Sequence, residues 1–214
     1  IWKGSMGFGM VIVPVKLYSA VDSHSSLFSN LHQECGSRLK QPKWCPVCDR
    51  EVQSGEIIKG FPISKDTYVP IMPEEMEALP LSSSKSIQIE AFVSGIEDPR
   101  WVDSPYFLSP EESGTKAFYL FMKAMEEQGV VGIGKISVRE REHLCVIRPF
   151  EGILMLQTMR WGDELREYGE LTVADTVSDR EMTMAKALIA GMTNEELDLW
   201  SYRDGYRQAV KELV

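Results

Sequence analysis

The sequence has few of the side chains on which most enzymes depend. It contains three histidines and four cysteines in 214 residues, and one histidine and three of the cysteines lie close together. The carboxylate pairs at residues 74–75 and 195–196 fall in the first turns of expected helices, where they interact favourably with the helix dipole. No credible nucleophile, general base or open metal site is left. We therefore expect a protein that is not an enzyme.

Long apolar runs are also absent. The longest, such as residues 152–156, are far too short to cross a bilayer, so no membrane association is expected. The chain begins at Ile1 without an initiator methionine or a leader, which suggests a trimmed fragment. Cysteines with metal-like spacing favour a reducing compartment over a disulfide-bonded secreted protein. The expected location is therefore the cytoplasm.

The chain also lacks net positive charge. Its formal charge is −9, whereas proteins that hold nucleic acid through its phosphates are normally basic. The acidic excess lies in residues 66–110 and 151–214, while residues 1–65 carry eight basic and five acidic side chains. Residues 111–150 are neutral overall. Composition alone therefore argues against nucleic-acid binding, but it leaves room for a basic surface built from the first and third of these segments.

The first two thirds of the chain has the patterning of strands. Val11, Val13, Val15 and Leu17 alternate with their neighbours, and Pro14 among them indicates an edge or a bulge. Further strands are expected at residues 56–61, 67–71, 86–93, 131–139, 144–148 and 153–160. Strands at such short spacing favour a barrel or a sandwich over a doubly wound sheet.

Helices interrupt this pattern and then end it. Residues 115–128 place apolar side chains on one face and are followed by Gly129, a typical helix stop. The last forty residues are expected to be helical, with capping boxes that begin at Ser178 and Thr193. The sequence thus predicts a mixed, mainly β fold with a C-terminal helical arm.

The strongest local motif is a candidate zinc site. His32-x-x-Cys35 is followed, after nine residues, by Cys45-x-x-Cys48. Zn²⁺ prefers four nitrogen or sulfur ligands in a tetrahedron, and each x-x spacing lets one tight turn present two of them. Four protein ligands leave no open position, so the expected zinc is structural. The alternatives are three buried thiols beside an unrelated histidine, and a redox pair at Cys45 and Cys48 that lacks the usual βαβ context.

A second motif resembles a nucleotide-binding loop but departs from it. Residues 129–135 fit Gly-x-x-x-x-Gly-Lys, but Ile136 follows where a magnesium-binding hydroxyl is required. The segment also runs from an expected helix into an expected strand, the reverse of a phosphate loop. A glycine-rich turn that ends the helix is the favoured interpretation, and nucleotide binding is not expected.

Basic side chains recur at positions that could face nucleic acid. Lys135, Arg139 and Arg141 alternate with Ile136 and Val138, and three more lie in the loop between the expected zinc ligands. The full set of candidates is Lys16, Arg38, Lys40, Lys43, Lys135, Arg139, Arg141 and Arg160. A solvated face explains any one of them, whereas together they predict a surface that follows phosphates.

The opening of the chain adds a resemblance. Residues 2–20 (WKGSMGFGMVIVPVKLYSA) closely resemble the opening of prokaryotic and phage Ku proteins. Further stretches match the same family in the same order: residues 28–48, 56–60, 106–110, 134–149 and 157–160, and the tail 182–213. The resemblance therefore extends over nearly the whole chain.

The resemblance implies both a fold and a function. The fold is a Ku-core β-barrel with a bridging insertion over residues 1–172, including the zinc-knuckle-like segment 32–48, and a helical arm over residues 173–214. Two copies are expected to form a ring-shaped homodimer through which duplex DNA threads, so that only a DNA end admits it. Such proteins bind double-stranded DNA ends in non-homologous end joining and recruit an ATP-dependent DNA ligase. Contacts to sugar and phosphate suit this task because they carry no sequence information.

The resemblance also bears on single residues. Lys16, Arg38, Lys40 and residues 135–141 match basic positions of the family, whereas the four expected zinc ligands occur in only some members. The prediction of a zinc site therefore depends on the spacing of these four residues and not on the resemblance. The chain ends at Val214, where bacterial members usually continue into a ligase-contacting extension, so weak or absent ligase recruitment is expected. The alternative is a zinc-stabilised protein-interaction module without DNA binding, which the acidic charge favours.

Overall fold

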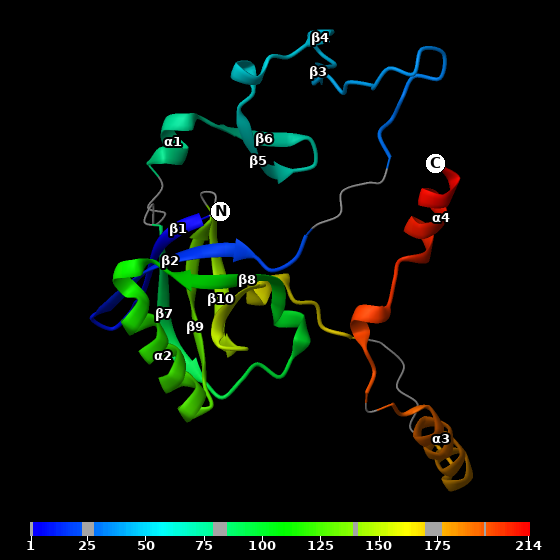
Figure 1. Ribbon diagram of the computed structural model, residues 1–214. Coiled ribbons are helices and arrows are strands. Elements are labelled where there is room, and N and C mark those ends of the chain that lie inside the picture. Colours follow the sequence, from blue (N-terminus) through cyan, green and yellow to red (C-terminus); the bar gives the residue numbers. More distant parts are fainter. Residues whose placement is uncertain (1, 23–27, 79–84, 139–140, 170–176, 195) are drawn as a thin grey trace. The chain divides into compact units, whose positions relative to one another are not determined.

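The computed structural model describes residues 2–22, 28–78, 85–138, 141–169, 177–194 and 196–214 (Figure 1). Its helices and longer strands are β1 (Trp2–Phe8), β2 (Val11–Ser19), β5 (Lys59–Ser64), β6 (Thr67–Ile71), α1 (Pro73–Glu77), β7 (Ser86–Val93), β8 (Val102–Pro110), α2 (Thr115–Gln128), β9 (Val131–Val138), β10 (Arg141–Phe150), β11 (Ile153–Met159), α3 (Asp179–Met192) and α4 (Gly205–Leu213). Two short strands, β3 (Trp44–Cys45) and β4 (Arg50–Glu51), form a hairpin of their own.

The chain divides into two compact units. The first comprises residues 1–24 and 29–165, and the second comprises residues 25–28 and 166–214. The domain boundary expected between residues 172 and 173 lies outside the described residues.

Seven strands of the first unit close into a barrel. Their order is β1-β2-β8-β11-β10-β9-β7, and β7 returns to β1 in the one parallel pairing of this sequence of strands. The mainly β fold with a barrel is thereby confirmed. The strand β8 was not expected, because Pro105 and Pro110 interrupt its pattern and proline is uncommon inside a sheet.

The barrel interior is filled by the apolar positions that alternate along its strands. In β2, Val13, Val15 and Leu17 are buried as expected from their spacing, and Pro14 lies just before the part of β2 that pairs with β8. The buried cluster of strand residues is Met6, Val13, Val15, Leu17, Ile87, Leu108, Ile136, Cys145, Ile147, Leu154 and Leu156. This single core gives the barrel its stability, because apolar burial is the main favourable term in folding.

The helix α2 completes this core from outside the sheet. It spans the residues expected from the sequence and ends at Gly129, whose φ of +63° is the left-handed conformation that glycine adopts readily. Phe121 stacks on Phe8 of β1 with ring centroids 4.1 Å apart. The buried face of α2 belongs to the same apolar cluster as the barrel interior, which ties the helix to the sheet.

The insertion between β2 and β7 has a different character. It contains the hairpins β3–β4 and β5–β6 and the short helix α1. Among its described residues from 28 to 70 none is buried, and only Cys45 and Val52 are half-buried. The strand expected at residues 56–61 begins later, at Lys59, whereas the strand expected at residues 67–71 coincides with β6.

The second unit contains the C-terminal helices. The capping box at Ser178 is confirmed, since the Ser178 main-chain N–H donates to Glu181 Oε2 at 2.9 Å. The box expected at Thr193 is wrong: the Thr193 hydroxyl donates back to the Ile189 carbonyl, so this residue ends α3 instead of starting a helix. The next α-helix, α4, begins at Gly205. In the described part of the chain no helix has the length and apolar character needed to cross a membrane.

Candidate nucleic-acid interface

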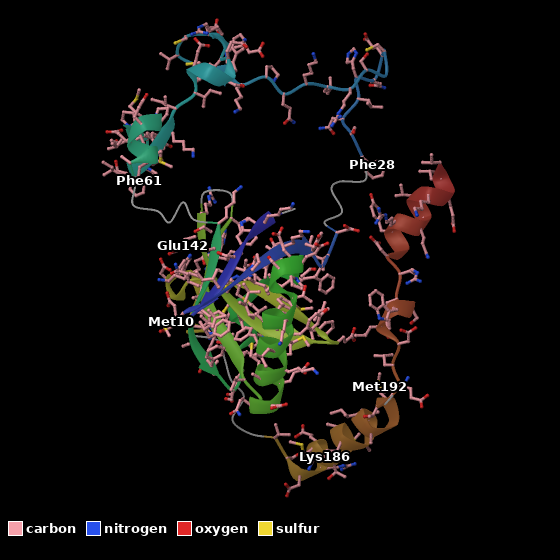
Figure 2. The ribbon with its side chains drawn as sticks, turned by 60° about the vertical axis from the view of Figure 1, so that its left-hand side comes forward. Met10, Phe28, Phe61, Glu142, Lys186 and Met192 are labelled. Atoms are coloured by element: carbon pink, nitrogen blue, oxygen red, sulfur yellow. The ribbon has the colours of Figure 1, made fainter. Side chains whose placement is uncertain are left out.

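The strand registers bring the ends of all seven barrel strands together at one rim, called here the basic rim. The strands β1, β7, β8 and β10 begin there, and β2, β9 and β11 end there. The pairs that fix the rim are Trp2–Leu17, Ser5–Ser86, Val138–Arg141 and Met159–Val102. In Figure 2, Glu142 marks this rim, and Met10 marks the β1–β2 turn away from it.

Four basic side chains of the rim lack an ion-pair partner in the described part of the chain. Lys3 lies directly opposite Lys16 across β1 and β2, and Lys16 faces outward because its neighbours in β2 are buried. Lys85 precedes β7 and accepts a main-chain hydrogen bond from Ser5 at 3.0 Å, and Arg141 begins β10. Within the described ranges none of these four side chains forms an ion pair. Like charges that face each other across two strands repel, and an anion placed between them removes that cost.

The end of the barrel unit opposite the basic rim is acidic. It includes the β10–β11 turn, the start of α2 and the end of α2 before β9. The side chains there include five acidic residues, Glu111, Glu112, Glu126, Glu127 and Glu151, and two basic residues, Lys116 and Lys123. The basic rim itself also carries acidic side chains, Asp103 at the start of β8 and Glu142 at the start of β10. Its lysines and arginines are therefore interspersed with carboxylates.

Arg160, one of the expected phosphate-binding residues, has protein partners. Its Nη1 donates to the carbonyls of Arg100 at 2.8 Å and Val102 at 3.0 Å, and its Nη2 lies 3.2 Å from Asp103 Oδ1. These contacts hold the start of β8 against the end of β11. A phosphate contact by Arg160 stays a prediction, and such a phosphate would compete with this ion pair.

Lys135 also has a partner. Its Nζ lies 3.3 Å from Glu90 Oε1 across β9 and β7, and both side chains are substantially exposed. An exposed pair of this kind contributes little to stability and is easily exchanged for another anion. Lys135 faces outward between buried Gly134 and Ile136, as the alternation predicts.

The remaining expected contact residues lie elsewhere. Arg38, Lys40 and Lys43 are exposed in the insertion, and Arg139 lies outside the described residues. Nothing places these side chains beside the basic rim, so their contact with nucleic acid stays a prediction. Lys3 and Lys85 were not among the expected contact residues, and only the strand register shows that they share a rim with Lys16.

The expected zinc ligands form two separate pairs in the insertion. His32 Nδ1 lies 3.2 Å from Cys35 Sγ. Hydrogen bonds from the side chain and the main chain of Ser37, together with His32, lower the pKa of Cys35 to about 7. In the second pair, main-chain hydrogen bonds from Cys48 and Val47 lower the pKa of Cys45. The hydrogen bond that Cys48 shares with Cys45 raises the pKa of Cys48.

The two pairs do not meet in the structure. Among the residues that it describes, no three or more histidine, cysteine or acidic side chains come together as a metal-binding group. Each pair by itself has the donor chemistry that Zn²⁺ prefers. The four-ligand site therefore stays a prediction.

Comparison with known proteins places this barrel in a family. Residues 7–185 match the family model described as the Ku70/Ku80 beta-barrel domain. The chain is 40% identical over its whole length to the non-homologous end joining protein Ku of Archaeoglobus fulgidus, of which it covers 85%. It is 39% identical to the protein of the same name from Symbiobacterium thermophilum, of which it covers 54%, and 32% identical to that of Bacillus subtilis, of which it covers 70%. The family model matches most of the barrel, and the relatives align with every part of the chain. The chain therefore belongs to the Ku family.

Proposed function

We propose that this chain is a non-catalytic protein that binds the ends of double-stranded DNA without sequence preference, as a ring-shaped homodimer, in the repair of double-strand breaks by non-homologous end joining. The observation that carries the proposal is the basic rim, where Lys3, Lys16, Lys85 and Arg141 form no ion pair with any residue that the structure describes. The names of its relatives state the same pathway.

The rim suits phosphate binding for a physical reason. Lys3 and Lys16 stand opposite each other on the outer face of the barrel. A phosphate between two such side chains relieves their mutual repulsion and releases condensed counterions from the DNA. Such contacts do not involve the base edges and so carry no sequence preference. A repair protein needs this because a break can occur at any sequence.

The connectivity of the chain supports a ring. The insertion, residues 20–85, leaves the barrel at the end of β2 and returns at the start of β7. Both points belong to the basic rim. An element anchored at both ends on the phosphate-binding surface is well placed to pass around a duplex. A closed ring loads at a DNA end, so topology supplies the selectivity that the side chains do not.

The surface of the second unit supports a homodimer. The helices α3 and α4 contain no buried residue, and Figure 2 shows side chains projecting from α3 on several sides, with Lys186 and Met192 labelled. The exposed large apolar residues of this unit include Val177, Met182, Met184, Leu188, Ile189, Met192, Leu197, Leu199, Trp200, Tyr202, Tyr206 and Leu213. So much exposed apolar surface indicates an interaction site. A second copy is the occupant that also closes a ring, since a two-fold interface buries the same patch on both subunits.

The proposal has two further parts. Broken DNA ends that are held together must still be joined covalently. The proposal therefore includes recruitment of an ATP-dependent DNA ligase. Co-purification of such a ligase with the chain would test this part. Chromosomal DNA as the ligand implies a protein that works in the cytoplasm.

Mobility-shift assays test DNA binding and threading. Linear duplex DNA should bind, covalently closed circles should not, and affinity should fall steeply with added salt. The double variant Lys3→Glu/Lys16→Glu should weaken binding to linear DNA about tenfold or more, because two phosphate contacts are lost. The matched control is Lys116→Glu/Lys123→Glu, which reverses two lysines of α2 and should leave the affinity within about twofold.

Two outcomes contradict parts of this proposal. Equal binding of linear and closed circular DNA would exclude threading. No DNA binding at low salt would exclude the function itself and would favour the alternative, a protein-interaction module stabilised by zinc.

A further inference from the structure

The barrel is closed by a short strand pairing that ends before the basic rim. β1 pairs with β2 along its whole length, but it pairs with β7 only from Ser5 to Gly7. This second pairing is parallel, and parallel pairs are slightly less stable per residue than antiparallel ones. On the other side of β7, pairing with β9 begins at Ile87, which lies opposite Ile136. The first residues of β1 and the last residues of β9 therefore extend past the start of β7, with no part of β7 between them.

The side chain of Trp2 spans this gap. Its indole N–H donates to the Ser137 carbonyl of β9 at 3.1 Å, and the two residues are 135 positions apart in the chain. The ring is half-buried and packs against the barrel core. A buried indole N–H usually finds an acceptor, and here the acceptor lies two strands away. The hydrogen bond thus links β1 to β9 past the start of β7.

Gly4 makes room for the indole. A Cβ at this position would lie 2.3 Å from Trp2 Cη2 and 2.1 Å from the Lys85 carbonyl oxygen. That carbonyl accepts the hydrogen bond from the Ser5 N–H at 3.0 Å, directly before β7 begins. The Trp2 ring and the main chain of Lys85 can therefore both lie against β1 only because residue 4 has no side chain.

The gap divides the four basic residues of the rim into two groups. Lys3 and Lys16 lie on β1 and β2, and are called here the β1–β2 side. Lys85 directly precedes β7, and Arg141 of β10 lies opposite Val138 of β9. These two residues are called the β7–β10 side. DNA that contacts all four residues must cross the gap.

The Trp2–Ser137 hydrogen bond lies between the two sides. Lys3 follows Trp2 directly, and Val138 follows Ser137 directly. The charges of a duplex backbone have a fixed spacing, so both sides bind phosphates at once only if the distance between them matches it. Holding this distance before DNA binds lowers the ordering cost of binding.

We propose that Trp2 is a positioning residue for DNA binding: its indole links β1 to β9 and fixes the distance between the two sides of the basic rim. The inference rests on the proposed binding of duplex DNA. Without the link, the short parallel pairing of β1 with β7 opens locally. Each side can then still contact phosphate, but the two sides no longer contact one backbone together. The barrel keeps its fold, because its core does not depend on this hydrogen bond.

The salt dependence of DNA binding tests this role. The slope of log K against log salt concentration reports the number of phosphates that the protein neutralises. Trp2→Phe keeps an aromatic ring but loses the N–H, and it should weaken binding of linear duplex about threefold and reduce the slope by about 1. Trp2→Ala should weaken binding about tenfold and reduce the slope by about 2.

Phe8→Leu is the matched control at the other end of the same strand. It removes the stacking on Phe121 and so destabilises the barrel away from the rim. Its DNA affinity should stay within about twofold of the wild-type value, with an unchanged slope. A wild-type slope in both Trp2 variants, or an equal loss of slope in Phe8→Leu, would overturn the proposal.

A double-mutant cycle separates positioning from general destabilisation. In the Lys3→Glu/Lys16→Glu background the β1–β2 side no longer binds phosphate, so nothing remains for Trp2 to position against the other side. Trp2→Phe should then change the affinity by less than about 1.5-fold, because coupled residues are not additive. The same threefold loss in both backgrounds would contradict a positioning role.

Hydrogen exchange of the DNA-free chain, resolved by peptide, gives a readout that does not depend on DNA. Trp2→Phe should speed exchange in the paired part of β1 and at the start of β7, and leave α2 unchanged. Unchanged exchange at both strands would overturn the link itself. If the wild-type chain binds no DNA, the proposed function fails and the positioning role with it. Normal DNA binding with an unaltered salt slope in the variants would refute only the role of Trp2.

Discussion

The thiols of Cys35 and Cys145 lie in opposite environments. Cys35 is exposed, and hydrogen bonds from Ser37 lower its pKa to about 7. Cys145 lies in the barrel core, where burial raises the pKa of its thiol to about 12. Burial disfavours the charged thiolate, whereas donors around the sulfur favour it.

This contrast predicts selective alkylation in the metal-free chain. Since the thiolate is the reactive form, iodoacetamide should label Cys35 at a rate that rises from about pH 6 to about pH 8 and then levels off. Cys145 should stay unlabelled over the same range. Peptide mass spectrometry after timed quenching measures both rates. A Cys35 rate that continues to rise tenfold per pH unit above pH 8 would contradict its lowered pKa.

Substitution of two arginines of the basic rim should have different effects on the stability of the barrel and on DNA binding. The Arg160 guanidinium is held by two carbonyls and Asp103, whereas Arg141 is exposed and has no ion-pair partner among the described residues. Arg160→Ala should lower the free energy of unfolding by about 1–2 kcal/mol, because partly exposed hydrogen bonds to a charged group are lost. Arg141→Ala should change it by less than about 0.5 kcal/mol while weakening DNA binding. Urea titration gives the first quantity and mobility shifts the second; equal stability losses would contradict the distinction.

At the scale of elements, Gly134 explains the glycine-rich stretch before Lys135. A Cβ at this position would lie 2.1 Å from the Gln88 carbonyl oxygen on β7, so β9 can approach β7 only with glycine there. The stretch that resembles a phosphate loop therefore serves strand packing.

The resulting prediction is that Gly134→Ala destabilises the barrel by roughly 3 kcal/mol, because main chain would have to move to relieve the overlap. Gly55→Ala is the control: no atom lies within 4 Å of its added Cβ. Urea unfolding followed by tryptophan fluorescence measures both. A loss for Gly134→Ala no larger than that of its control would show that the strands have room for a side chain.

The first turn of α3 depends on Ser178. Its side chain and main chain exchange hydrogen bonds with Glu181, which satisfies two N–H groups that otherwise lack partners. Ser178→Ala should lower the local stability of this turn by about 1 kcal/mol. Thr193→Ala, at the other end of the helix, should leave that turn unchanged. Hydrogen exchange of the full chain, resolved by peptide, measures the effect; equal exchange in the two variants would contradict the capping role.

At the scale of the whole molecule, the exposed apolar residues of α3 predict self-association. The chain has a mass of 24.2 kDa, and sedimentation equilibrium should give twice that value. The variant Leu188→Glu/Ile189→Glu should shift the molecule toward the monomer, since charges placed in an apolar interface are not compensated. Lys186→Glu on the same helix is the control and should remain dimeric. A monomeric wild-type chain at micromolar concentration would remove the homodimer from the proposal.

The predictable parts of this fold share a local cause. The helix α2, the strand β6 and the cap at Ser178 were expected because each depends on spacing or on residues within one turn. The strand β8 was not expected, because Pro105 and Pro110 interrupt its alternation of apolar residues. It forms a strand because β2 and β11 pair with it on both sides. Thr193 and Glu196 have the spacing of a capping box, but Thr193 already ends α3 through its bond to Ile189.

By itself the sequence determined the mainly β fold, the family resemblance and the four candidate metal ligands, because periodicity and short spacings are properties of the chain alone. Tertiary structure decided which basic residues share a surface. Lys3, Lys16, Lys85 and Arg141 are far apart in sequence and meet only through strand register. The main-chain hydrogen bonds that close the chain around residues 32–35 and 45–48, from Leu39 to Asn30 and from Val52 to Lys43, were likewise visible only in the structure. Register and backbone geometry arise from pairing between segments, and no single segment specifies them.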